Sequence, residues 1–323
     1  MIYQADRRSV AFLSVYYAVV IAAWSIPTSW PARVALMLFF CFSSFTAAIM
    51  SHNTAHTPLF RERWKNAIWG VLLSMAFGGP VAGFVPGHNL SHHAHLGTEM
   101  DNVRHGKARF RWNFLNQALF FFLVLPSILR NEQRYWAEVK HDPRVKDWAF
   151  QYRLENWALN LYLFLPLVLD AIALQGVPWR ALMFVLIPKV YGVWGIFGTN
   201  YWQHDGCDTE SEYNHSRSFM SPVLNYFAFN NGFHAVHHDR PELHWSLLPA
   251  YHAANYHGRC HPSLEQKSLF LYLCRTCLWP AKRETYDGKP VVLPPASPDV
   301  DWPIVPMGFN GPIRDARLPE TQT

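Results

Sequence analysis

Residues 88–101 read HNLSHHAHLGTEMD, with four histidines inside eight residues and an aspartate at the end of the stretch. Imidazole is a ligand for zinc, copper, iron and nickel, so this density of histidine favours a metal site. A polar loop that is rich in histidine by chance is the alternative. The other histidines of the chain decide between the two.

Three further histidine motifs support the metal site. They are HxxxH at residues 52–56, NxxxH at residues 200–204 and HxxHH at residues 234–238, and each lies beside a long apolar run. Together with residues 88–95, these groups hold at least nine of the 17 histidines. His52 and His56 are spaced i, i+4, so on a helix they share one face.

Adjacent histidines occur twice, at residues 92–93 and 237–238. Two neighbouring side chains on a helix point in different directions, so each doublet suits two metal ions, or one ion and a supporting role. Zinc is saturated by four ligands, or by three with an open position, and this chain offers eight or nine. We therefore predict two ions. An all-nitrogen shell with open positions indicates a redox centre that handles oxygen, with iron as the first choice.

The composition indicates a membrane part joined to a sizeable polar part. Apolar residues make up 50% of the 323 residues and charged residues 16%, below the usual quarter of a soluble domain, yet the mean hydropathy is only −0.05. The chain has five cysteines, an odd number, and their spacing does not match that of a disulfide framework. Both facts argue against a disulfide scaffold. No nucleic-acid motif or basic run occurs, so we expect no nucleic-acid partner.

Four apolar runs are long enough to approach the length of a membrane crossing. Short links join them into two antiparallel hairpins, and the runs cover residues 9–26, 34–50, 157–174 and 181–198. Residues 68–85 are apolar but contain Gly78-Gly79-Pro80, so we predict a broken or re-entrant helix there. Residues 114–129 are expected to form an amphipathic, interfacial helix. Asp170 and Lys189 lie inside the second hairpin, where we expect a mutual ion pair or a lysine that lines an internal cavity.

Lysine and arginine predict the orientation in the membrane. The short links, residues 27–33 and 175–180, carry one arginine each, whereas residues 51–156 carry thirteen basic residues and residues 199–323 carry ten. The positive-inside rule then places both large segments and the N-terminus in the cytoplasm. Two hairpins put every histidine motif on that same side.

Together, these motifs resemble those of the membrane fatty acid desaturase and hydroxylase superfamily. The three histidine boxes of that family match residues 52–56, 88–93 and 234–238, and its additional NxxxH group matches residues 200–204. Thr98 and Asp101 stand five and eight residues after His93, the last histidine of the second box, as in that family, and WSLLP at residues 245–249 resembles the segment after its last box.

The resemblance covers roughly residues 9–250 and implies an all-α integral membrane fold. Four transmembrane helices in two hairpins would carry a cytoplasmic helical cap with a histidine-rich di-iron site. We predict a desaturase-like membrane domain over residues 1–250, with cytoplasmic histidine boxes at residues 52–105 and 200–250. Residues 251–323 are expected to form a cytoplasmic C-terminal helix and an extended tail.

The resemblance also implies a ligand set for two non-haem irons. The catalytic, metal-binding residues would be His52, His56, His88, His92, His93, His204, His234, His237 and His238. Asn200 would hold a water near one iron. The second box has three residues between its first histidine and its doublet, one more than in stearoyl-type desaturases, which makes His95 a possible substitute for His88.

Three aspartates lie near enough in sequence to orient ligating imidazoles through the second ring nitrogen, namely Asp101, Asp205 and Asp239. A solvated loop position is the alternative for each of them. The histidines outside the boxes are expected to be surface residues or supports for the ligands, and they are His105, His141, His215, His244, His252, His257 and His261.

The implied reaction is O2-dependent oxidation of an unactivated C–H bond in a lipid or fatty acyl chain, with desaturation as the first choice. Hydroxylation, carotenoid ketolation and oxidative decarboxylation to a terminal alkene are alternatives within the family. No haem-binding HPGG motif or Gly-rich dinucleotide fingerprint occurs, so electrons are expected from a separate ferredoxin, rubredoxin or cytochrome b5. The basic cytoplasmic surface suits an acidic carrier.

Two non-enzymatic readings compete with this one. A membrane metal transporter would place its ligands at the bilayer midplane, whereas here the motifs lie past the ends of the apolar runs. A haem electron carrier needs paired histidines on facing helices rather than adjacent doublets. Both readings are therefore disfavoured.

Overall fold

A computed structural model describes residues 1–278, 281 and 283–306 of the chain. The end of the expected C-terminal tail, residues 307–323, lies outside the described residues. The chain divides into two compact units. Unit 1 comprises Met1–Phe84 and Lys146–Ile196, and unit 2 comprises Val85–Val145 and the described residues from Phe197 onward.

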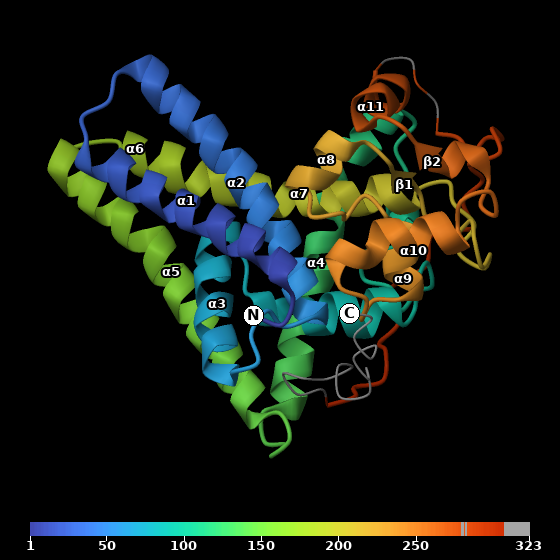
Figure 1. Ribbon diagram of the computed structural model, residues 1–323, viewed down its shortest axis with the longest axis horizontal. Coiled ribbons are helices and arrows are strands. Elements are labelled where there is room, and N and C mark those ends of the chain that lie inside the picture. Colours follow the sequence, from blue (N-terminus) through green and yellow to red (C-terminus); the bar gives the residue numbers. More distant parts are fainter. Residues whose placement is uncertain (279–280, 282, 307–323) are drawn as a thin grey trace. The chain divides into compact units, whose positions relative to one another are not determined.

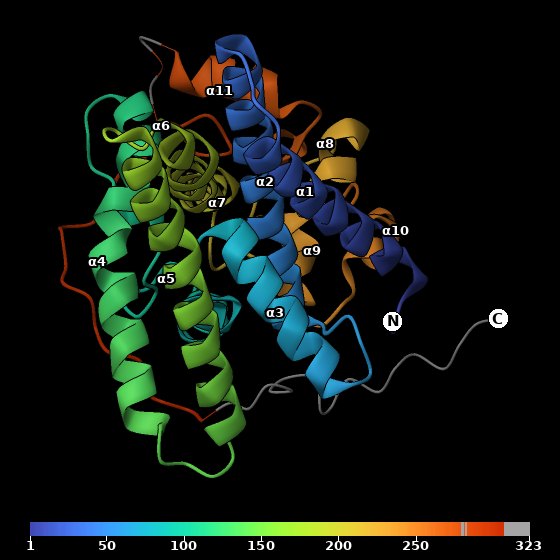
Figure 2. The ribbon, with the colours of Figure 1, turned by 90° about the vertical axis from the view of Figure 1, so that its left-hand side faces the viewer.

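Unit 1 is built from long apolar helices. The helices are α1 (Arg7–Ser25), α2 (Trp30–His56), α3 (Arg63–Phe77), α5 (Lys146–Leu174), α6 (Trp179–Ala181), a π-helical turn over Leu182–Leu186 and the first part of α7 (Ile187–His204), with short 3-10 turns at Gln4–Asp6 and Val81–Gly83. Figure 1 shows α1 and α2 as a hairpin, and α3 packs against both α2 and α5 (Figure 2). Pro31 in the first turn of α2 is compatible with the helix, because the first N–H groups have no intrahelical acceptor.

Among the described residues, five helices are long and apolar enough to cross a membrane. Four of them contain most of the expected runs, with bounds Gln4–Ser25, Trp30–His56, Lys146–Leu174 and Trp179–His204. The fifth is α4 (Asn113–Val139), for which the sequence suggested an interfacial position. Arg63–Phe77 and Val81–His93 qualify only when taken together as one broken span, in the region where Gly78-Gly79-Pro80 predicted a break. The expected count of four crossings therefore stays a prediction.

Asp170 and Lys189, the two charged residues expected to pair, bind other groups. Lys189 Nζ donates to the Tyr16 hydroxyl (2.8 Å) and to the Ala76 carbonyl (2.5 Å). The Asp170 carboxylate accepts the N–H of Ala181 (3.1 Å). The expected ion pair between them is wrong. Each charged side chain instead binds a backbone group near a helix end, where the helix itself offers that group no hydrogen-bond partner.

Two buried charges hold the break after α3. Gly78 ends the helix with φ +107°, and a Cβ there would lie 2.7 Å from the Lys189 side chain. Lys189 binds the Ala76 carbonyl before the break, and the fully buried Glu155 accepts the N–H of Ala82 (2.8 Å) after it. A cation at a carboxyl end and an anion at an amino end both complement the helix dipole. We call Glu155 and Lys189 the break clamp.

Unit 2 consists of shorter elements and loops. They are a π-helix over Val85–His93, a 3-10 turn at His105–Lys107, α4, the end of α7, α8 (Pro222–Phe227), α9 (His234–Asp239), a 3-10 turn at Trp245–Leu247, α10 (Leu248–Asn255), a 3-10 turn at Pro262–Leu264 and α11 (Leu269–Cys277). A parallel two-stranded sheet pairs β1 (Ser218–Phe219) with β2 (Glu265–Gln266). Its register joins Ser218 to Glu265 and Phe219 to Gln266.

One apolar core cluster of unit 2 lies between α4 and the end of α7. It contains Val103, Ala108, Phe120, Val124 and Tyr201. The described tail follows α11 and packs its Trp302 against α4, where the ring is 1% exposed and lies under the Arg134 guanidinium. The tail therefore adds to the packing of unit 2.

Candidate metal centre

Four histidines of unit 2 converge on one point. His92 comes from the π-helix, His204 from the end of α7, and His234 and His238 from α9. One ring nitrogen of each lies within 4.8 Å of the corresponding nitrogen of every other. His92, His204 and His234 are almost fully buried. We call these residues the four-histidine group.

Protein groups on the far side of the ring hold two of these histidines in place. His92 Nδ1 is 3.1 Å from a carboxylate oxygen of the buried Asp101. His204 Nδ1 is 3.3 Å from the His215 carbonyl and 3.4 Å from the Ser216 hydroxyl. Because Nδ1 is engaged in both rings, Nε2 is the atom left to face the group.

The protonation states suit metal binding. Burial alone would raise the pKa of Asp101, but the His92 ring and the N–H groups of Gly97 and Val103 hold that pKa below its ordinary value. Asp101 is therefore a carboxylate at neutral pH. Burial and the neighbouring histidines hold the pKa of His238 well below the ordinary value, so its ring is neutral, which is the form that binds metals.

The inner ring nitrogens of the group meet other imidazoles, the Asn200 side chain or no partner among the described residues. His204 Nε2 and His234 Nε2 are 2.9 Å apart, and His238 Nε2 is buried with no hydrogen-bond partner among the described residues. The Asn200 side chain reaches the group with its nitrogen 3.0 Å from His92 Nε2, while its buried oxygen has no partner in the described part of the chain. Buried polar atoms are normally paired, and a cation is the partner that convergent neutral imidazoles suit. These residues therefore fit a metal ion.

Three more histidines of unit 2 form a second convergence, which we call the three-histidine group. His93 Nε2 is 3.0 Å from both His88 Nε2 and His237 Nε2. The stacked rings of His88 and His237 have centroids 5.9 Å apart. His88 thus lies in the group despite the longer spacing of its box, and His95 belongs to neither group of ring nitrogens among the described residues.

Each doublet divides its two rings between the groups, as the sequence predicts. His92 and His238 belong to the four-histidine group, whereas His93 and His237 belong to the three-histidine group. Successive side chains on a helical turn point in different directions, which gives this division its cause. Only two convergent sets of ligand atoms arise in unit 2 within the described residues.

His52 and His56 lie at the end of α2 in unit 1. Both are buried, and their ring centroids are 5.4 Å apart, as expected for one helix face. His52 also stacks on Phe84 at 6.1 Å. Their role as metal ligands stays a prediction.

The three candidate aspartates differ in what they bind. Asp101 supports His92, as hypothesised. Asp205 instead forms an ion pair with Arg283 (2.5 Å), and Asp239 accepts the Tyr251 hydroxyl (3.2 Å). The hypothesis that Asp205 and Asp239 orient imidazoles is therefore corrected, because cationic or hydroxyl donors occupy their carboxylates.

The sequence motifs do not distinguish His215 from the other histidines outside the boxes, and they predict no role for Ser216. Both support His204, and His215 does so through its backbone carbonyl, which no side-chain motif can reveal. His252 is equally buried, but Glu265 meets its Nε2 at 2.8 Å. His252 therefore needs no metal to satisfy that nitrogen.

The chain is similar in sequence to known proteins. A family model described as "Fatty acid desaturase" matches residues 28–264. Two curated relatives are the alkane 1-monooxygenases of Pseudomonas putida and Ectopseudomonas oleovorans, each 25% identical over 259 and 262 residues respectively. The alignments cover 75% of this chain, and the chain spans 60% of the length of each relative.

Proposed function

Because the chain belongs to the fatty acid desaturase family, we propose that this multi-pass membrane protein is an O2-dependent oxidoreductase that attacks an unactivated C–H bond of a lipid or alkane chain. The convergence of seven histidines of unit 2 into two groups carries the proposal. Oxygen insertion is our first choice, since both relatives are named alkane 1-monooxygenase. Desaturation is the second, because it gives the family model its name.

The proposed ligands are the nine histidines of the boxes and of the NxxxH motif. The four-histidine group would hold one iron, and the three-histidine group would hold the other. His52 and His56 are proposed as further ligands on the resemblance of their box alone. Neutral imidazole suits iron, and it leaves room for open positions when fewer than six ligands bind. When bound, two such irons supply the activation of O2.

The chain's own residues fix the geometry of the site. Asp101 holds the His92 ring by its Nδ1, so that Nε2 stays directed at the group. The unpartnered oxygen of Asn200 is suited to hold a water there, in keeping with the role expected from its motif. Burial of His92, His204 and His234 keeps bulk water away from the ring nitrogens.

The overall reaction requires an electron source. Inserting one oxygen atom into a C–H bond and releasing the other as water consumes two electrons and two protons per O2. We expect a separate ferredoxin, rubredoxin or cytochrome b5 to deliver the electrons from the cytoplasm. We expect the metal site on that face, because the segments around the histidine motifs hold most of the basic residues.

Heavy-isotope O2 tests the proposal and separates its two outcomes. Membranes from a host expressing the protein would receive an alkane or a fatty acid, a reductant and an electron carrier. Oxygen insertion puts the label into an alcohol, whereas desaturation gives an unlabelled alkene and labelled water only. His93→Ala and His237→Ala should abolish either product. The control His261→Ala should not, because the exposed His261 belongs to neither group and binds Ser263.

Product formation without oxygen, or equal products from wild type and the His93 variant, would contradict the enzymatic proposal. A metal transporter or an electron carrier would then have to be reconsidered. In either of those cases the protein would bind metal but would not consume O2 in the presence of substrate.

A further inference from the structure

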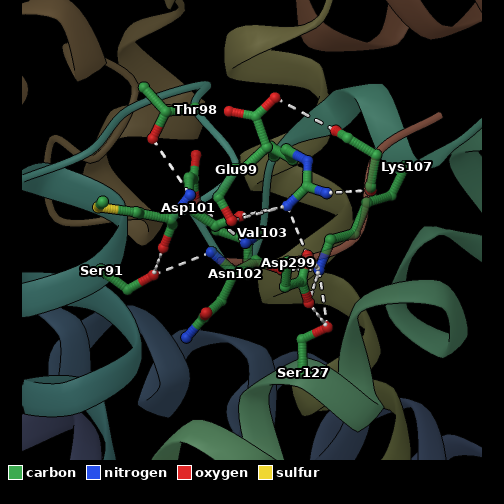
Figure 3. Close-up of polar contacts among 12 residues, drawn as sticks. Ser91, Thr98, Glu99, Asp101, Asn102, Val103, Lys107, Ser127 and Asp299 are labelled. Atoms are coloured by element: carbon green, nitrogen blue, oxygen red, sulfur yellow. Dashed lines mark hydrogen bonds and ion pairs between the residues drawn. The ribbon is translucent and has the colours of Figure 1, made fainter. Parts of the chain in front are cut away.

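The extended tail of unit 2 places one carboxylate next to the loop that follows the π-helix. Figure 3 shows Asp299 of the tail among Lys107, Ser127 and the residues from Thr98 onward. We propose that Asp299 is a positioning residue for His92, acting through Arg104 and Asp101. This inference rests on the proposed function, because it assigns His92 to a metal.

The first link joins the tail to the loop. Arg104 Nη1 donates to Asp299 (2.5 Å), and Arg104 Nη2 donates to the Ser297 carbonyl (2.9 Å). The N–H of Val300 donates to the Glu99 carbonyl (3.0 Å). The tail therefore binds the Arg104 side chain at one end of this loop and the Glu99 backbone at the other.

The second link runs inside the loop. Arg104 Nη1 also donates to the backbone carbonyls of Glu99 (3.2 Å) and Asp101 (3.5 Å). Lys107 Nζ donates to Asp299 (2.9 Å) and to the Asn102 carbonyl (2.8 Å). Two cations that Asp299 holds in place thus bind three backbone carbonyls of the loop, those of Glu99, Asp101 and Asn102.

The third link reaches the metal ligand. The Asp101 carboxylate accepts the N–H groups of Gly97 (2.9 Å) and Val103 (2.9 Å), and it lies 3.1 Å from His92 Nδ1. A shift of this backbone would therefore move the carboxylate that orients the ring. Such outer partners typically change metal affinity about 10–100-fold when they are mutated.

Charge makes Asp299 the critical member of this network. The side chains of Arg104, Lys107 and Asp299 are only 10–12% exposed. Burial would raise the pKa of Asp299, but hydrogen bonds from Ser127, Lys107 and Arg104 hold it below its ordinary value, so the group is a carboxylate. Without that carboxylate, two largely buried cations lose their counter-charge and must move toward water, taking the loop with them.

The chain offers a matched control two residues away. Asp301 lies on the same tail, but its side chain is 58% exposed, and its ion pairs within the described residues are the long ones to Arg130 (3.9 Å) and Arg134 (3.8 Å). These arginines lie on α4 rather than on the loop. Arg130 also lies 3.7 Å from Asp299, so the two tail carboxylates share this exposed cation. Asp301→Asn nevertheless leaves every contact of the path from Asp299 through Arg104 to Asp101 in place.

The experiment measures iron retention in purified full-length protein. Wild type, Asp299→Asn, Asp299→Glu and Asp301→Asn are each loaded with iron and challenged with a chelator, while Mössbauer spectra follow the two iron components. We expect Asp299→Asn to lose one component at least about tenfold faster than wild type. Asp301→Asn should stay within about twofold of wild type, and Asp299→Glu should recover most of the retention.

Equal iron retention in wild type and Asp299→Asn would overturn the inference, even if the variant unfolds at a lower temperature. If Asp299→Asn does not fold, Ser127→Ala takes its place, since it removes one hydrogen bond to Asp299 and leaves every charge intact. Iron loss from the same component that is faster than in wild type supports the path, even if the increase is smaller than tenfold. A rate of iron loss equal to that of wild type contradicts the path. Wild-type protein that binds no metal would overturn the proposed function and this inference together.

Discussion

Glu155 in unit 1 and His238 in unit 2 both bury a polar atom, but only Glu155 meets donors from the protein. Glu155 accepts the N–H of Ala82 and the Gln151 amide at 2.8 Å each. His238 Nε2 is buried without a hydrogen-bond partner in the described chain, and it faces other imidazoles. A buried polar group that the protein satisfies stabilises the fold, whereas one that it leaves open calls for a ligand. The break clamp and the four-histidine group are thus expected to respond differently to mutation.

The largest expected effect is on the four-histidine group. His204→Ala should remove one iron and reduce product to background, because it deletes a ligand and opens a coordination position. The matched variant His252→Ala removes an equally buried histidine whose Nε2 already has Glu265 as partner. Iron analysis and product assay should find His252→Ala loaded and active. Iron loss in both variants would mean that any buried histidine affects the metal, and the comparison would fail.

Mutation of the break clamp should affect stability first. Glu155→Leu removes the acceptor of the Ala82 N–H, and Lys189→Met removes the donor to the Ala76 carbonyl. Each variant leaves a buried backbone group without its partner, which costs about 1–3 kcal/mol. Thermal unfolding in detergent should show a lower Tm for both. The protein that remains folded should carry the same iron per chain as wild type. An unchanged Tm would show that these buried charges do not stabilise the break after α3.

A smaller effect is expected at the support of His92. Asp101→Asn keeps the size of the side chain but removes its charge, so metal affinity should fall about 10–100-fold while the ligand itself remains. Titration with a competing chelator measures this affinity. Asp239→Asn is the control, because Asp239 binds the Tyr251 hydroxyl. Equal affinities for Asp101→Asn and wild type would remove Asp101 from the site.

The smallest effect is expected on the pH dependence of stability, through Glu265, the carboxylate that binds His252. Burial raises the pKa of Glu265, but the hydrogen bonds from His252 and His257 lower it by more than burial raises it. The pKa of Glu265 is therefore below the ordinary 4.5. The resulting stabilisation is complete above pH 4.5 and is lost as the pH falls through the lower, folded-state value. The Tm difference between wild type and Glu265→Gln should therefore shrink in that acid range. A difference that does not change with pH would contradict this assignment.

The sequence predicted local features of the site better than distant ones. The HH doublets predicted that the two rings of each doublet point to different places, because the direction of neighbouring side chains follows from helix geometry alone. Their role as ligands stays a prediction. The partners of Asp205 and Lys189 were missed, since Arg283 and Ala76 lie far away along the chain and no spacing rule connects them. The role of α4 was also ambiguous, because its apolar first half is followed by charged residues from Arg130 onward.

The tail was the least predictable part. Its proline-rich sequence indicated an extended segment but gave no sign that Asp299 would reach Arg104 and Lys107. Asp299 and Asp301 lie in the same segment without periodicity, and nothing in the sequence distinguishes the buried carboxylate from the exposed one. Only the fold brings Asp299 beside two cations from a distant loop.

Iron counting in the doublet variants tests the central claim most directly. Because His92 and His93 face different groups, wild type should hold about two irons per chain, and His92→Ala and His93→Ala should each weaken a different Mössbauer component. The double variant should retain neither. A wild type with a single metal ion, or single variants that lose the same component, would contradict the two-iron account.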